Sequence, residues 1–167
     1  MTDYIVISMT HLDRIDRKIL TILQKNARIT NKELASQLGL SPPPTLERVK
    51  KLESSGYITG YAALLDPKKI DLGTVMMVSV SLHQHSQDTI DDFYKAVDSL
   101  DEVLECYHVT GDDDFMLKVV CKDINEYERF VREKLAKLNS LGKIKSSVVL
   151  STLKNAIEYP IREPFLK

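Results

Sequence analysis

Apolar residues in the first sixty positions recur at intervals of three and four, which is the spacing of one helix face. Two such stripes come first, and they predict helices over residues 12–27 and 30–39. The stripes consist of Leu12, Ile15, Ile19, Ile22 and Leu23, and then of Leu34, Ala35 and Leu38. Thr30 and Glu33 have the spacing of a capping box, and Gly39 suits a helix end.

A third helix is predicted to follow the stretch "SPPP", residues 41–44. Leu46, Val49 and Leu52 share one face and are expected in the core. Because proline pushes the preceding residue out of the helical region, we expect Pro42 and Pro43 to be extended and the helix to begin near Pro44. The opposite face then carries Pro44, Glu47, Arg48 and Lys51, with Lys50 beside them.

Helix, short glycine-containing turn, helix is the helix-turn-helix pattern, whose second helix reads bases near its N-terminus. The contacts that we expect with double-stranded DNA are base edges for Pro43, Pro44 and Thr45, a guanine or a phosphate for Arg48, and the backbone for Lys50 and Lys51, with Glu47 on the same face. Proline ring carbons are suitable partners for thymine methyl groups. In the alternative interpretation the prolines only fix the turn, and the polar face is merely solvated.

The composition changes after residue 56. Ile58, Tyr61, Ala63 and Leu65 suggest short strands that serve as a wing or as a linker, and Asp66-Pro67 marks a turn. We therefore expect four parts: a winged helix-turn-helix domain over 1–60, a linker over 61–73, a second domain over 74–155 and a C-terminal tail over 156–167.

The second domain shows strand, helix and strand twice over. Alternating apolar positions predict strands at 74–83, 103–109, 115–121 and 144–152, and helical stripes predict helices at 87–100 and 124–138. This order is the split βαβ of a ferredoxin-like βαββαβ fold, so the fold class is α+β. The sheet face without helices would carry Val75, Met77 and Val149, an apolar patch that a second subunit can cover. We expect dimerisation through this domain.

Composition and charge exclude several classes of protein. The chain is 43% hydrophobic and 28% charged, and it has no run of eighteen apolar residues, so no membrane partner is expected. Residues 1–60 carry nine basic and six acidic residues, whereas the remainder carries fourteen and eighteen, which makes the first part net +3 and the second net −4.

The first ten residues are too short for a signal peptide and contain Asp3. They predict a short strand or a loose tail, and translation starting at Met9 is an alternative. Cys106 and Cys121 form no framework, and we expect both as buried, reduced thiols in a cytoplasmic protein.

The segment "TGDDDF", residues 110–115, places three adjacent carboxylates at a glycine turn. They could bind a cation or the ammonium group of a small ligand, or they could form a solvated hairpin tip; the spacing is not that of a calcium loop. His83 with His85, and Cys106 with His108, each supply two ligands at most, so no metal or other cofactor is expected. Phosphate loops and hydrolase motifs are missing from the sequence, which leaves an enzyme interpretation without residues to carry it.

The segments "LDRIDRKIL", "NARITNKELASQLGLS", "RVKKLESSGYITGYAALLDPKKIDLG", "TGDDDFMLKV" and "VVL" occur in an order that resembles the Lrp/AsnC (feast/famine) transcriptional regulators. The resemblance covers residues 11–155. It implies a winged helix-turn-helix joined to a ligand-responsive ferredoxin-like domain. It further implies homodimers that assemble into tetramers or octamers, with small effectors, typically amino acids, bound where dimers meet.

The resemblance also implies particular site residues. The family's turn motif places Thr110, Gly111 and Asp114 at effector positions, with Asp112 and Asp113 in variable slots, and Ser147 and Val148 at positions that often line the same cleft. Arg48 falls on the usual arginine of the recognition helix. The sequence departs from the family at Asp113, where the residue is often neutral or aromatic, and at Pro43 and Pro44, where small polar residues or alanine are common.

The function expected from the sequence is therefore a DNA-binding transcriptional regulator that acts as a symmetric dimer and responds to an amino acid. One alternative is a partner subunit that does not bind DNA and modulates the assembly of a related regulator. Another is an enzyme that uses the ferredoxin-like domain with a metal or a cofactor.

Overall fold

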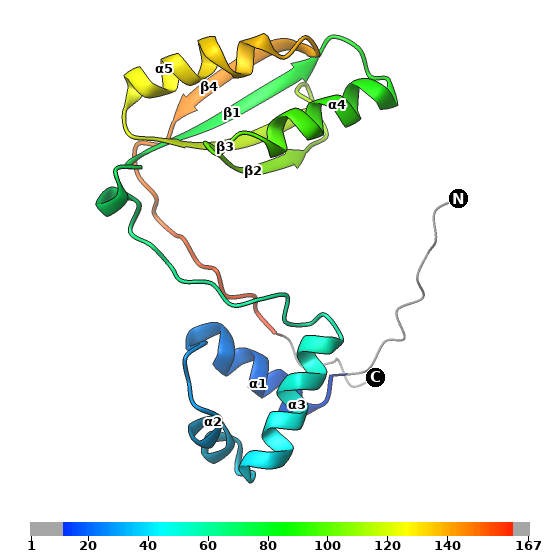
Figure 1. The fold of residues 1–167 in the computed structure, drawn as a ribbon, viewed down its shortest axis with the longest axis vertical. Coiled ribbons are helices and arrows are strands. Elements are labelled where there is room, and N and C mark those ends of the chain that lie inside the picture. The colour runs from blue at the N-terminus through cyan, green and yellow to red at the C-terminus, as the bar shows by residue number, and fades with distance from the viewer. Residues whose placement is uncertain (1–11, 162–167) are drawn as a thin grey trace. The chain divides into compact units, whose positions relative to one another are not determined.

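The structure is a computed structural model that describes residues 12–161, and it divides the chain into two units (Figure 1). The first unit runs to Ala63 and also takes in the segment that starts at Lys154, and the second is Leu64–Leu153. The expected N-terminal strand and the end of the C-terminal tail lie outside the described residues.

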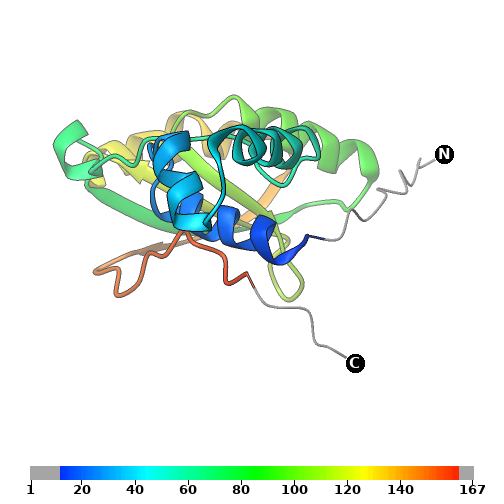
Figure 2. The same cartoon turned by 90° about the horizontal axis from the view of Figure 1, so that it is seen from below.

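The first unit contains three helices, α1 (Arg14–Lys25), α2 (Asn31–Leu38) and α3 (Pro42–Ser54), drawn from blue to cyan in Figure 2. Their inner faces share one small core. Asp13 caps α1 and Thr30 caps α2, each in a reciprocal capping box, so the first amides of both helices find acceptors. Gly39 ends α2 in the left-handed conformation, with φ of 70°, which glycine adopts without strain. Ile19, Leu34 and Leu52 form the buried centre.

The helix α3 begins two residues earlier than the sequence predicts. Pro42 and Pro43 are helical rather than extended, and Ser41 is the residue held in the extended region, with φ of −82° and ψ of 155°. The first amides of a helix have no partner within the helix, so three prolines in the first turn cost no helical hydrogen bond.

The buried stripe of α3 also differs from the predicted one. Thr45 is fully buried, whereas Leu46 is 42% exposed. Thr45, Val49 and Leu52 therefore form the inner stripe, with spacings of four and three. The hydroxyl of Thr45 donates to the carbonyl of Ser41 at 3.0 Å, and this hydrogen bond removes most of the cost of burying it. A stripe chosen from apolar residues alone passes over this threonine.

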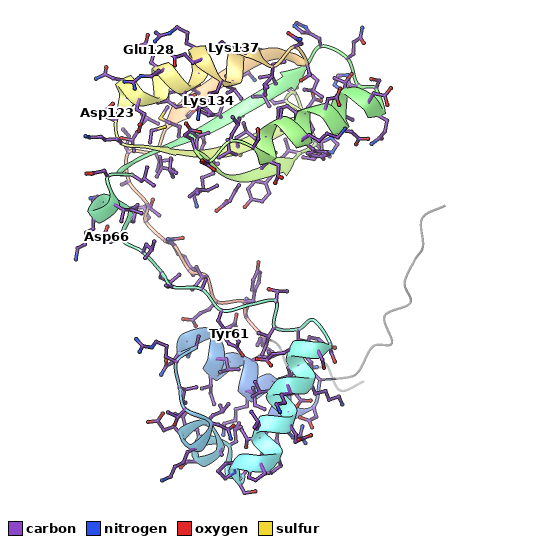
Figure 3. The ribbon with its side chains drawn as sticks, viewed as in Figure 1. Tyr61, Asp66, Asp123, Glu128, Lys134 and Lys137 are labelled. Atoms are coloured by element: carbon purple, nitrogen blue, oxygen red, sulfur yellow. The ribbon has the colours of Figure 1, made fainter. Side chains whose placement is uncertain are left out.

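The structure places no strand between α3 and the second unit's sheet, so the predicted strands there are wrong. Residues 58–66 are irregular and mostly exposed, and they lead into a single 3-10 turn, η1 (Pro67–Ile70), which Asp66 caps. A strand needs a neighbour for its ladder, and no described segment pairs with this one. Tyr61 donates its hydroxyl to Glu53 at 2.8 Å and so ties this segment to the end of α3 (Figure 3 labels Tyr61 and Asp66).

The second unit is the predicted α+β sandwich. Its sheet has the order β2-β3-β1-β4 and is antiparallel throughout, with β1 (Thr74–Leu82), β2 (Val103–His108), β3 (Phe115–Cys121) and β4 (Leu141–Val148). The helices α4 (Gln87–Asp98) and α5 (Ile124–Glu133), with a final turn η2 (Leu135–Lys137), share one core with the sheet. Met76, Val78 and Val80 of β1 face this core, as the alternation predicts.

The other face of the sheet carries no helix. Cross-strand pairing places Val75 and Met77 of β1 on it, next to Lys118 of β3 and Ser147 and Lys145 of β4. Val75, Met77 and Val149 are half-buried. Within residues 12–161, no helix combines the length and apolar composition that crossing a bilayer requires.

The segment after β4 packs against α1. The side-chain amide of Gln24 donates to the carbonyl of Tyr159 at 3.2 Å, and its oxygen accepts the Tyr159 N–H at 2.6 Å. This pairing explains why the residues from Lys154 onward belong to the first unit. The second unit is thus joined to the first at both of its chain ends.

Candidate functional site

The outward face of α3 carries most of the side chains predicted to contact DNA. Pro43, Pro44, Glu47, Lys50 and Lys51 are all exposed. Neither lysine has an ion pair with another residue in the range 12–161. The face therefore offers apolar proline rings in the first turn of the helix and two solvated cations about two turns further along it.

Thr45 does not belong to this face. Its side chain is fully buried and its hydroxyl is bonded within the helix, so the prediction that it approaches base edges is corrected. The residue that is exposed instead is Leu46, which the sequence placed in the core.

Arg48 lies on the side of α3 that faces α1. Its Nη1 is 2.6 Å from Oδ2 of Asp13 and 2.7 Å from Oδ1 of Asp16, and the side chain is 34% exposed. These hydrogen bonds, the one to Asp13 first, raise the pKa of Arg48 above its usual value. We call Arg48, Asp13 and Asp16 the Arg48 cluster. The guanidinium predicted for DNA is thus held by two carboxylates of the same unit.

Asp13 of this cluster is also the N-cap of α1. Burial alone would raise its pKa, but hydrogen bonds from the Asp16 N–H and from the Arg48 guanidinium outweigh burial and lower the pKa of Asp13. Asp13 and Asp16 have capping-box spacing, which could have been recognised in the sequence. Their pairing with Arg48 spans more than thirty residues, and no local pattern signals it.

The predicted effector residues Thr110–Asp114 form the turn between β2 and β3, which we call the acidic turn. Thr110, Gly111 and Asp112 are exposed, whereas Asp113 and Asp114 are half-buried. Gly111 has φ of 129°, a conformation that favours glycine. The three carboxylates are in three different environments.

Asp114 fixes the acidic turn to the end of β1. Its Oδ2 accepts the Leu82 N–H at 2.7 Å, and its Oδ1 is 2.8 Å from Nε2 of His85. The Leu82 hydrogen bond, followed by that of His85, lowers the pKa of Asp114 despite partial burial. Its carboxylate is therefore occupied by partners of its own chain.

Asp113 lies against the helix-free face of the sheet. Nζ of Lys145 is 2.9 Å from its Oδ2, and the Ser81 hydroxyl is 3.4 Å from its Oδ1. The Lys145 ammonium is the main cause that lowers the pKa of Asp113, and Lys143 adds to it at longer range. Asp112 has no ion pair with another described residue, so it is the carboxylate of the turn that is free for an external cation.

Ser147 and Val148 do not share one surface. Ser147 pairs with Met77 on the helix-free face, two residues along β4 from Lys145. Val148 pairs with Met76, whose side chain faces the core, and is 45% exposed near the end of its strand. The structure therefore groups Ser147 with Lys145 and Asp113, and it leaves Val148 on the opposite side.

Two surface pockets of this unit lie beside α4, and neither is lined by the acidic turn.

Metal binding finds no support in the described residues, where no three His, Cys, Asp or Glu side chains are grouped so that they could hold an ion. Lys134, at the C-terminal end of α5, lies 2.6 Å from a carboxylate oxygen of Glu102, the residue directly before β2 (Figure 3 labels Lys134). This ion pair links the end of α5 to the start of β2.

Comparison with known proteins matches both units. Residues 75–158 match the family model described as the Lrp/AsnC ligand binding domain, and residues 12–59 match a winged helix-turn-helix DNA-binding model. The leucine-responsive regulatory proteins of Klebsiella pneumoniae and Escherichia coli K12 are each 41% identical to the chain over 145 residues, which is 87% of this chain and 88% of theirs.

Solved structures agree with these matches. A transcriptional regulator from Neisseria meningitidis, in complex with L-Met, superposes with a TM-score of 0.86 at 38% identity, covering 90% of this chain and 97% of the other. AsnC of Escherichia coli superposes with a TM-score of 0.80 at 30% identity, covering 87% and 96%. The chain therefore belongs to the Lrp/AsnC family of transcriptional regulators.

Proposed function

We propose that this regulator binds double-stranded DNA through the outward face of α3, with contacts from Pro43, Pro44, Glu47, Lys50 and Lys51. The observation that carries the proposal is the pair of exposed lysines on the second helix of a helix-turn-helix, neither of which has an ion pair with another residue of the described range. Lysines of this kind neutralise phosphates, while groups nearer the helix N-terminus meet base edges. Arg48 supports the proposed site indirectly, because its ion pairs with Asp13 and Asp16 hold α3 against the start of α1.

The regulator acts as a homodimer that assembles further, to a tetramer or an octamer. The helix-free face of the sheet supports this part of the proposal, because half-buried Val75, Met77 and Val149 gain from being covered by a second copy. Two recognition helices related by a two-fold axis read half-sites separated by about 34 Å or a multiple of it. A transcriptional regulator works where the chromosome is, so we place it in the cytoplasm.

The effector is a small molecule, by class an amino acid, bound at the acidic turn between dimers. Asp112 offers a free carboxylate to an ammonium group, and the Asp113–Lys145 pair can exchange its internal contact for both charges of a zwitterion. Ser147 lies on the same face as this pair. The L-Met bound by the Neisseria regulator supports the ligand class. Such an effector changes DNA affinity by favouring one assembly state.

Selection of bound sites from random duplex DNA tests the proposal, with and without each of the twenty amino acids. We expect an enriched two-fold symmetric motif, and at least one amino acid that changes its enrichment. The matched pair of variants is Lys50→Ala with Lys51→Ala, which should abolish enrichment, and Lys95→Ala with Lys137→Ala, which removes the same charge from exposed sites of the second unit. A folded wild-type protein that enriches no motif at low salt would overturn the proposal.

A further inference from the structure

The N-terminal half of α3 carries an exposed leucine next to the proposed phosphate contacts. Leu46 is 42% exposed, and its helical neighbours at three and four residues are Pro43 and Lys50. We call Pro43, Leu46, Glu47 and Lys50 the α3 strip; their spacings of three, four and seven place them on one continuous surface of the helix.

Leu46 has no part in the core of the first unit. The buried and half-buried residues of that core include Val49 and Leu52 from α3, and Leu46 is not among them. Thr45 takes the inner position one residue earlier. Leu46 therefore lies outside the core cluster, and a large part of its apolar side chain is open to another use.

Major-groove edges offer one apolar group, the C5 methyl of thymine, and the other edge groups are hydrogen-bond donors and acceptors. The second helix of a helix-turn-helix places its N-terminal residues at these edges. With Lys50 and Lys51 on phosphates, Leu46 and the ring of Pro43 form the apolar part of the same face. A leucine side chain has no donor or acceptor, so a methyl group is the feature of a base edge that it can recognise.

We propose that Leu46 is a specificity-determining residue that contacts a thymine methyl group in each half-site. This inference rests on the proposed DNA-binding function and deepens it by naming the base. The contact makes the protein prefer an A·T pair at one position of the half-site. The preference depends on the methyl group itself and not on hydrogen bonds.

Replacing thymine by uracil isolates this contact, because uracil differs from thymine only by the missing methyl. The motif selected by the wild-type protein is synthesised with uracil at each thymine position in turn, and the affinity of wild type and of Leu46→Ala is measured for every duplex. We expect two symmetry-related thymines, one in each half-site, where a single replacement by uracil weakens wild-type binding about fourfold, the effect of one buried methyl. Leu46→Ala should bind the thymine and uracil duplexes equally.

Two further measurements separate the possible failures. Glu53→Gln, on the same flank of α3 but at its other end, keeps an acceptor for the Tyr61 hydroxyl, so it is the matched control and should retain the uracil effect. Circular dichroism and sedimentation should show Leu46→Ala folded and assembled like the wild type. A selected motif in which uracil has the same effect on both proteins, or none on either, would overturn the role of Leu46 and leave the DNA-binding function standing. A wild-type protein that selects no motif would overturn the proposed function itself.

Discussion

The two groups of carboxylates in this chain have different relations to their surroundings. In the Arg48 cluster, Asp13 and Asp16 both bond one guanidinium within the first unit. In the acidic turn, Asp114 bonds Leu82 and His85, Asp113 bonds Lys145, and Asp112 remains exposed. The first cluster is internal, whereas the second keeps one carboxylate open. The availability of a charged group for DNA or for a ligand is thus decided by partners about thirty residues away in sequence, and not by its local motif.

Arg48→Ala should have the largest effect, because it leaves two acceptors of the cluster without their donor. Charge-assisted hydrogen bonds of this kind contribute about 1.5–3 kcal/mol, and partial exposure places the expected loss near the lower end. Urea unfolding would measure it, with Arg28→Ala, an exposed arginine of the same unit, as the control. Unchanged stability together with lost DNA binding would show that Arg48 contacts DNA directly.

Asp114→Ala comes next, since it removes the acceptor of the Leu82 N–H at the base of the acidic turn. The expected loss in the free energy of unfolding is about 1 kcal/mol, the lower end of the cost of a buried donor without its partner, because the site is only partly buried. The effector response should be blunted while basal DNA binding is retained. A variant as stable as the wild type would remove Asp114 from its structural role.

Acid should weaken the second unit through the same carboxylate. The folded pKa of Asp114 is below its ordinary value of 3.8, so its stabilisation is complete above that value and is lost as the pH falls through the lowered pKa. The free energy of unfolding, measured by urea at each pH of this range, should fall less steeply with decreasing pH for Asp114→Asn than for the wild type. Equal slopes for the two proteins would show that Asp114 does not carry the acid sensitivity.

Asp112→Asn should have the smallest effect on stability, within about 0.5 kcal/mol of the wild type, because it is an exposed substitution. It should still reduce the effector's influence on DNA binding, which a titration with the selected amino acid would measure. Asp101→Asn, another exposed aspartate of this unit, is the control. An undiminished response in Asp112→Asn would place the effector site elsewhere.

The sequence predicts the second unit well because its signal is repeated. Met76, Val78 and Val80 alternate over a whole strand, and each buried position supports the same register. In α3 the signal is short, and one buried threonine in place of an apolar residue shifts the inner face by one position. The start of α3 was predicted too late for a related reason. Proline disfavours a helical conformation in the residue before it, but the first turn of a helix needs no amide donors, so Pro42 and Pro43 are helical here.

The candidate sites divide in the same way. The exposure of Lys50 and Lys51 follows from helical periodicity and was predictable. The turn at Gly111 was predictable as well. The partners Lys145 of Asp113 and Asp13 of Arg48 come from elements far away in sequence. Only the folded arrangement shows which of these charges are already paired.

The salt dependence of binding to the selected site tests most directly whether α3 reads DNA while Arg48 stays in its cluster. The slope of log affinity against log salt counts neutralised phosphates, at about 0.9 per contact. Lys50→Ala should reduce the slope by about one for each recognition helix, and Arg48→Ala, measured where it is folded, should leave the slope unchanged. A slope reduced equally by Arg48→Ala and by Lys50→Ala would contradict the account and return Arg48 to the DNA surface.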